Sequence, residues 1–275
     1  MNGTGTGTDR SNRDREGDDH VDRISGLPNA LLIRILTFLG TRDAIRTSML
    51  HRPFDHLWKS LSHLAVREDD FDGVRDPRAR ARRYSRFLFK VFTLLETREI
   101  ESFIFNVDFH ARGLEYDHEL ADMLDMWMLL PLERRAKHLS LMYGWPIEGR
   151  VPSFYYRLPS VILRSTAIVG LHLSFCNVQH LGQIQIQLPS LQTLTMTDVN
   201  LSDELLLNLP VRPSFRWNCV TMVLRLAKRH LPGIAFLLKS CCCLETLTFY
   251  VYPLSAGDIE DTIPNKMEEI KIHAS

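Results

Sequence analysis

The sequence has no excess of either charge and no long hydrophobic run. Thirty-three Lys and Arg balance thirty-three Asp and Glu, so the formal net charge of the 275 residues is zero. A balanced chain has no bulk field that attracts nucleic acid or another polyanion. Its apolar runs fall short of the about 20 residues that a membrane-spanning helix needs. Residues 1–20 hold no large apolar side chain after Met1, so we expect a disordered tail and no secretory signal there. We therefore expect neither a membrane nor a nucleic-acid partner.

Cysteines are few, and catalytic motifs are absent. The five cysteines are an odd number, with three adjacent at 241–243, which argues for a reducing compartment, the cytoplasm and/or the nucleus. There is no Gly-x-Ser-x-Gly, His-Glu-x-x-His, P-loop or paired Cys-x-x-Cys motif. His172, Cys176 and His180 are four residues apart, but they lie in a strand-and-loop pattern and structural zinc uses four ligands. We expect no catalytic residue, no cofactor and no metal.

Short helices are predicted in residues 21–66. Pro28 suits the first turn of the first helix and Gly40 its end, and Thr41 suits the N-cap of a second. Pro53 can open a third helix. The first helix is predicted from apolar residues spaced along one helix face: Leu27, Leu31, Leu32, Ile35, Leu36 and Leu39. So small a unit has little core of its own, so its leucines are expected to face a partner or the rest of the chain.

Residues 67–98 predict a charged linker followed by a helix. The segment 75–86, RDPRARARRYSR, holds six arginines, a pattern found in nuclear-import and nucleic-acid patches. Four acids within residues 68–72 cancel much of that field, which favours a solvated linker and helix face. Phe87, Val91, Leu94 and Leu95 then predict an amphipathic helix.

A short apolar pattern recurs beyond residue 98. Its seven trios begin 23 to 36 residues apart: Ile100-Phe103-Phe105, Ala136-Leu139-Leu141, Ile168-Leu171-Leu173, Leu191-Leu194-Met196, Cys219-Met222-Leu224, Leu244-Leu247-Phe249 and Met267-Ile270-Ile272. The later spacings approach the about 20 to 29 residues of leucine-rich repeats. Each trio fits a short strand with one buried face, and stacking such units in parallel gives a curved solenoid. The alternative is an α/β domain with ordinary leucine-containing strands.

The N-terminal pattern resembles the F-box of plant F-box proteins. Within residues 22–58 the matching positions are Asp22, Ile24, Leu27, Pro28, Leu31, Leu32, Ile35, Leu36, Phe38, Leu39, Thr41, Asp43, Ala44, Thr47, Ser48, Leu50, Leu57 and Trp58. Segments such as Leu171-His172-Leu173-Ser174-Phe175-Cys176 are similar to the repeats of plant F-box, leucine-rich-repeat and FBD-type proteins. Residues 231–247 resemble the FBD-like end of that family. The resemblance covers residues 21–275.

The resemblance implies an α/β fold, with a three-helix F-box followed by a short leucine-rich-repeat domain, an αβ solenoid of horseshoe-like form. The expected organisation is a disordered polar tail at 1–20, the F-box at 21–66 and a charged linker and helix at 67–98. The leucine-rich-repeat region follows at 99–230 and the FBD-like C-terminal repeats at 231–275.

The implied function is a non-catalytic substrate-recognition adaptor of an SCF-type ubiquitin ligase. The F-box would dock on a Skp-type linker, and through it on a cullin scaffold, while the repeats bind an unknown protein target for ubiquitination. Leu27, Pro28, Leu31, Ile35 and Leu36 would face the linker, with Ile45 and Trp58 supporting the interface. The alternative is a leucine-rich-repeat interaction protein without ligase coupling, a divergent or truncated family member.

Two departures from the family pattern bear on these expectations. Arg52-Pro53-Phe54 stands where the family has Lys/Arg-Arg-Trp, so the third helix is expected to begin later or pack less well. After residues 208–213 the chain passes almost directly to the FBD-like part. We hypothesise that one or more repeats are missing near residues 208–216.

Overall fold

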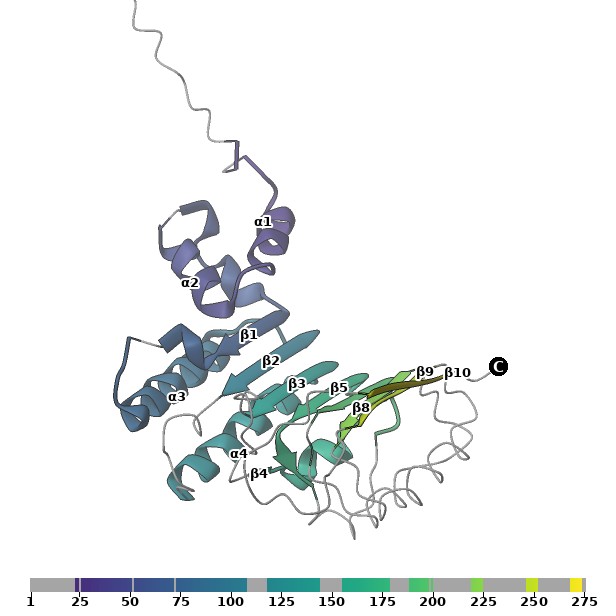
Figure 1. Ribbon diagram of the computed structural model, residues 1–275. Helices are drawn as coiled ribbons and strands as arrows, with labels where there is room; N and C mark the ends of the chain where they lie inside the picture. Colours follow the sequence, from purple (N-terminus) through teal and green to yellow (C-terminus); the bar gives the residue numbers. More distant parts are fainter. Residues whose placement is uncertain are drawn as a thin grey trace, which may run out of the picture.

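In the computed structural model the described residues are 23–24, 26–50, 52–71, 73–107, 118–143, 155–178, 188–197, 199, 219–224, 246–251 and 268–273. They form a mixed α/β structure in which four α-helices accompany a mostly parallel sheet (Figure 1). The tail at 1–20 and the junction at 208–216, each the subject of a prediction above, lie outside these residues.

Two short helices precede the sheet, α1 (Asn29–Leu36) and α2 (Thr41–Leu50). The expected third helix is replaced by two 3-10 helices, η1 (Arg52–Phe54) and η2 (Leu57–Ser60). Between them His56 has a φ of 62°, a left-handed conformation that a right-handed helix cannot contain. The prediction of one continuous third helix from Pro53 is therefore wrong.

The sheet begins inside the segment predicted to be only helical. Strand β1 (His63–Arg67) follows η2 directly, and Leu64 and Val66 on its inner face are 1% and 0% exposed. It pairs in parallel with β2 (Ser102–Val107), which places Leu64 opposite Phe103 and Val66 opposite Phe105. The helical unit is thus followed, without a linker, by the first strand of the sheet.

All seven apolar trios fall in or beside a strand. After β2 these strands are β3 (His138–Tyr143), β5 (Gly170–Ser174), β7 (Thr193–Thr197), β8 (Cys219–Leu224), β9 (Thr246–Val251) and β10 (Glu268–His273). The order in the sheet is β1-β2-β3-β5-β7-β8-β9-β10, so each of these strands pairs with the next along the chain. A separate pair joins β4 (Tyr156–Arg157) to β6 (Cys176–Asn177), and a 3-10 helix, η5 (Ser160–Arg164), lies between them in the chain.

Two details of the sheet differ from the expected parallel stack. The last strand, β10, pairs with β9 in an antiparallel direction, which needs no crossover over a sheet face. In β8 the register places Val220 beside Leu194 and Met222 beside Met196, so the predicted trio begins two residues too late. Five of the six residues of β8 are apolar, which leaves the inward positions ambiguous in the sequence.

Two helices cover one side of the sheet (Figure 1). Helix α3 (Pro77–Leu94) connects β1 to β2 and α4 (His118–Glu133) connects β2 to β3. Asp76 caps α3, because its carboxylate accepts hydrogen bonds from the N–H groups of Arg78 and Ala79. Preceding this helix is a 3-10 turn, η3 (Glu68–Phe71).

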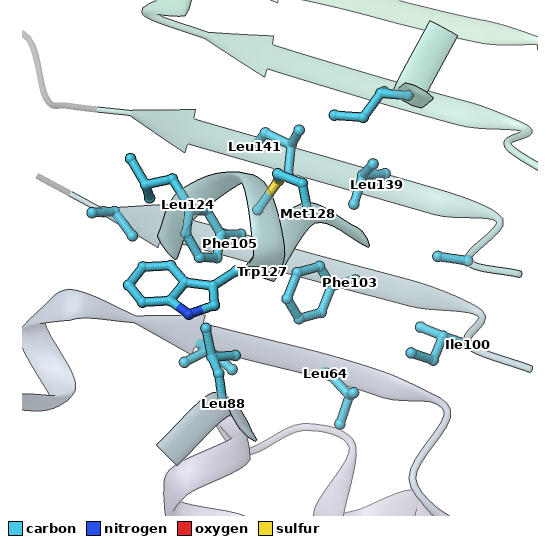
Figure 2. Close-up of a cluster of buried hydrophobic side chains, with 14 of the residues drawn as sticks. Leu64, Leu88, Ile100, Phe103, Phe105, Leu124, Trp127, Met128, Leu139 and Leu141 are labelled. Carbon is cyan, nitrogen blue, oxygen red and sulfur yellow. The ribbon is translucent and has the colours of Figure 1, made fainter. Parts of the chain in front are cut away.

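Aromatic side chains fill the space between these helices and the strands (Figure 2). Trp127 of α4 packs on Phe105 of β2, with ring centroids 5.8 Å apart. The Trp127 indole N–H donates to Ser85 Oγ of α3 at 3.2 Å, so this large buried aromatic has a partner for its one polar atom. One continuous cluster of buried side chains runs from Leu32 in α1 to Val199 beyond β7.

One arginine of the predicted solvated run lies in the interior. Arg80 is 1% exposed, and its Nη1 donates to Glu68 Oε1 at 3.1 Å. Its Nε and Nη2 donate to the carbonyl oxygen of Val74 at 3.1 and 2.7 Å. The interpretation of the run as a wholly solvated surface is wrong at this position, because Arg80 ties α3 to the turn that precedes it.

Replacing Glu68 with glutamine leaves the Arg80 charge buried without its carboxylate. Breaking a buried ion pair by removing one partner costs about 3–5 kcal/mol. We expect Glu68→Gln to lower the free energy of unfolding by about that amount in urea titrations. Arg83→Gln, at an exposed position of the same helix, is the control and should change it by less than about 0.5 kcal/mol. Equal shifts in the two variants would contradict the structural role of the pair.

Candidate partner-docking surfaces

Helix α1 is apolar on two neighbouring faces, and the fold buries only one of them. Leu32 and Leu36 are 1% and 0% exposed. Leu31 and Ile35 on the adjacent face are 48% and 42% exposed. Residues four apart share a helix face, so an exposed apolar stripe runs alongside the buried one.

Exposed apolar residues also flank both ends of the helix. Phe38 and Leu39, just after α1, are 81% and 38% exposed, and Ile24 before it is 53% exposed. We define the α1 apolar strip as Ile24, Leu31, Ile35, Phe38 and Leu39. Single exposed apolar residues are common, but a row of them along one helix marks an interaction surface.

The structure separates the residues predicted to contact a linker into three groups by exposure. Exposed ones are Pro28, Leu31 and Ile35, and Leu27 and Ile45 are half-buried against the core; Leu36 and Trp58 are 0% and 8% exposed. Leu36 cannot face a partner while its side chain lies in the core, so that assignment is corrected. The helical spacing in the sequence shows that both faces of α1 are apolar but not which one the chain itself covers.

Phe38 is the most exposed residue of the strip, and the predicted set omitted it together with Ile24 and Leu39. It follows Ile35 by three residues, the spacing that continues a helix face. Phe38 lies two residues after Leu36, the last residue of α1, and in this part of the chain the predicted set stopped at Leu36.

Backbone and side-chain hydrogen bonds attach the strip-bearing unit to the sheet. Thr41, predicted to cap α2, is 1% exposed, and its Oγ1 accepts a hydrogen bond from the Ala65 N–H of β1 at 2.8 Å. The Lys59 carbonyl of η2 accepts hydrogen bonds from the N–H groups of Glu96 and Thr97 at 2.8 and 3.4 Å. The α1 apolar strip is therefore held in a defined position relative to the strands.

The sheet face turned away from α3 and α4 carries polar side chains. Ser140, His172 and Thr195 are register partners on β3, β5 and β7, and all three are half-buried. The His172 ring lies between two hydroxyls, with Nδ1 3.3 Å from Ser140 Oγ and Nε2 3.1 Å from Ser174 Oγ. This second surface differs in kind from the strip, because it offers hydrogen-bonding groups rather than apolar ones.

Neither surface carries the chemistry of an enzyme or metal site within the part of the chain that the structure describes. His172 lies in β5 and Cys176 in β6, as the strand pattern predicted. Burial raises the pKa of the Cys176 thiol, which keeps it protonated and unreactive. Among the described residues no three potential ligands are grouped to hold a metal ion, and no helix has the length and hydropathy to cross a bilayer.

Comparison of the sequence with known proteins tests the resemblance to plant F-box proteins. The chain is 27% identical over 193 residues to F-box/LRR-repeat protein 13 of Arabidopsis thaliana, an alignment that covers 69% of the chain and 38% of that protein. It is 25% identical over 251 residues to F-box protein At1g60400 of the same plant, covering 91% and 51%. The chain is related to the plant F-box/LRR/FBD proteins. This confirms the resemblance that the sequence predicted.

A third relative, F-box/FBD/LRR-repeat protein At4g00160 of Arabidopsis thaliana, is 27% identical over 185 residues, which cover 66% of the chain and 37% of that protein. The chain thus spans about a third to a half of the length of these plant F-box/LRR/FBD relatives. No family model and no solved structure matches it.

Neighbouring positions of α1 test the division between its two apolar faces. We expect Leu36→Ala to lower the free energy of unfolding by about 2–5 kcal/mol, because it empties a fully buried site. Ile35→Ala, one residue away on the α1 apolar strip, should cost less than about 1 kcal/mol. Urea unfolding of both variants measures the difference, and a larger loss for Ile35→Ala would reverse the assignment of the faces.

A second test concerns His172 and pH. Burial lowers the pKa of the His172 imidazole below its ordinary value of 6.5, so the unfolded chain binds more protons than the folded one just below that pH. The neutral His172 imidazole therefore stabilises the folded chain above about pH 6.5. This contribution is lost as the pH falls toward the pKa that His172 has in the folded chain. We expect His172→Gln to show a smaller fall in Tm between about pH 7.5 and 5.5 than the parent chain. His63→Gln, at an exposed position at the start of β1, is the control and should retain the full fall.

Proposed function

We propose that the chain is a non-catalytic substrate-recognition adaptor of an SCF-type ubiquitin ligase. The observation that carries the proposal is the α1 apolar strip, which the fold leaves open although the same helix also contributes Leu36 to the core. The similarity to proteins named as F-box proteins supports the proposal independently of that geometry. Residues 21–66 would act as the F-box, with η1 and η2 in place of its third helix.

Docking on a Skp-type linker would bury Leu31, Ile35 and Phe38 in a groove between partner helices. Helix-in-groove recognition uses anchors at this i, i+4, i+7 spacing. Each apolar side chain that becomes fully buried contributes about 1.5–3 kcal/mol, so three anchors suffice to dominate the affinity. Leu36 and Trp58 would brace the anchors from within the chain, and the linker would in turn hold a cullin scaffold.

The strands would present the target. Because each strand pairs with the next along the chain, the sheet suits a short leucine-rich-repeat solenoid in which neighbouring repeats supply the contacts. The polar surface around Ser140, His172 and Thr195 would then face a protein target in the cytoplasm and/or nucleus. Fold alone does not name that target.

Capture of a purified plant Skp-type linker protein tests the proposal. We expect the parent chain to bind it, and the triple variant Leu31→Ser, Ile35→Ser, Phe38→Ser to bind about a hundredfold more weakly in titration calorimetry. Met49→Ser with Leu50→Ser is the matched control, because these residues are 80% and 86% exposed on α2 but lie outside the strip. Its affinity should stay within about twofold of the parent.

Absence of binding by the parent chain would overturn the adaptor proposal and favour the alternative of a repeat-type interaction protein without ligase coupling. Phe54 weighs against that alternative, since it is 7% exposed and therefore packs into the core despite its departure from the family pattern. Equal binding by parent and triple variant would place the linker elsewhere on the chain.

A further inference from the structure

Helix α3 carries a concentration of positive charge, and the fold pairs only part of it. Its 18 residues include six basic side chains and no acidic one. Arg80 alone is buried and paired, with Glu68. We define the α3 basic face as the exposed cations Arg82, Arg83, Arg86 and Lys90 together with Phe89, which is 65% exposed.

These side chains share one side of the helix. At about 100° and 1.5 Å per residue, Arg82, Arg86 and Lys90 follow one another at steps of about 40° around and 6 Å along the axis. Phe89 lies within the same arc, whereas Tyr84 and Leu88 on the opposite side are both 0% exposed against the sheet. The cations therefore project together from the outer side of α3.

The charges of this face are not neutralised by the part of the chain that the structure describes. Arg82, Arg83, Arg86 and Lys90 form no ion pair with a carboxylate among the described residues. The nearest acid in sequence, Asp76, is occupied in capping the helix. Positive charge is thus left available to a partner.

Helix stability does not explain the arrangement. Arg82–Arg86 and Arg86–Lys90 are like-charge pairs at i, i+4, which repel along a helix. Cations toward the N-terminal end also oppose the helix dipole, which favours acids there. A sequence that destabilises its own helix in this way is expected where function requires those side chains.

We infer that the α3 basic face docks an acidic protein segment that brings an apolar side chain to Phe89. From Arg82 to Lys90 the face spans about 12 Å, the length of about four extended residues. Arginine and aromatic residues are enriched at protein interfaces. A DNA duplex fits less well, because its bases are stacked inside and its phosphate backbone offers no apolar surface to Phe89.

This inference does not rest on the adaptor proposal, since α3 is a different element from α1 and the two surfaces are tested with different ligands. Leu94, 49% exposed near the end of α3, follows Lys90 by four residues and so adds a second apolar side chain beside the cations. The combination of cations with apolar side chains is what distinguishes the expected partner from a simple polyanion.

Fluorescence anisotropy with a labelled peptide, Glu-Asp-Leu-Glu-Glu-Leu-Asp-Glu, tests the inference on the full chain. We expect Arg82→Gln, Arg86→Gln, Lys90→Gln to raise the Kd about tenfold. The control triple Arg98→Gln, Arg157→Gln, Arg164→Gln removes the same charge from exposed positions elsewhere and should change the Kd less than about twofold. Circular dichroism of each variant confirms that it is folded.

The Phe89→Ala variant distinguishes a partner that has apolar side chains from a simple polyanion. It should weaken binding of the leucine-containing peptide and leave unchanged the binding of a peptide with serine in place of leucine. Equal effects of the two triple variants would overturn the inference. So would a short DNA duplex that binds more tightly than the peptide and loses affinity when the α3 cations are removed.

Discussion

The parallel pairing of β1 with β2 is the constraint on which the rest of the structure depends. It places Leu64 and Val66 beside Phe103 and Phe105 and so extends one core from the strands into the helical unit. The Ala65 N–H, on the same strand, donates to Thr41 at the start of α2. Parallel neighbours need a crossover, and here the crossover is α3. A single strand thereby positions the α1 apolar strip and the α3 basic face relative to the sheet.

The division of α1 follows from the size of the helical unit. Two short helices and two 3-10 turns enclose too little volume to bury every leucine that the segment contains. Leu32 and Leu36 pack into the shared core, and Leu31 and Ile35 stay outside it. An apolar sequence that exceeds the burying capacity of its own fold is explained most simply by a surface that a partner completes.

The sequence allowed the strands to be predicted better than the docking residues. Period-two alternation around Leu139 and Leu171 located β3 and β5, because one face of each strand must be apolar. Strand β1 was missed since its three apolar residues, Leu64 to Val66, lack alternation. Leu36 was misplaced because periodicity alone does not say which apolar face the chain covers. The Arg80–Glu68 pair depends on tertiary packing across 12 residues, which no local pattern reveals.

Although the chain has zero net charge, it carries two surfaces that differ in the interaction they offer, one apolar and one electrostatic. Apolar burial at the α1 apolar strip depends little on ionic strength, whereas attraction to the α3 basic face is screened over a Debye length of about 10 Å at 0.1 M salt. Affinity at the strip is expected to reside in slow dissociation, and affinity at Arg82 and Arg86 in fast, electrostatically steered association. Because both surfaces are fixed to one sheet, a partner held at the strip leaves α3 free to exchange acidic segments rapidly.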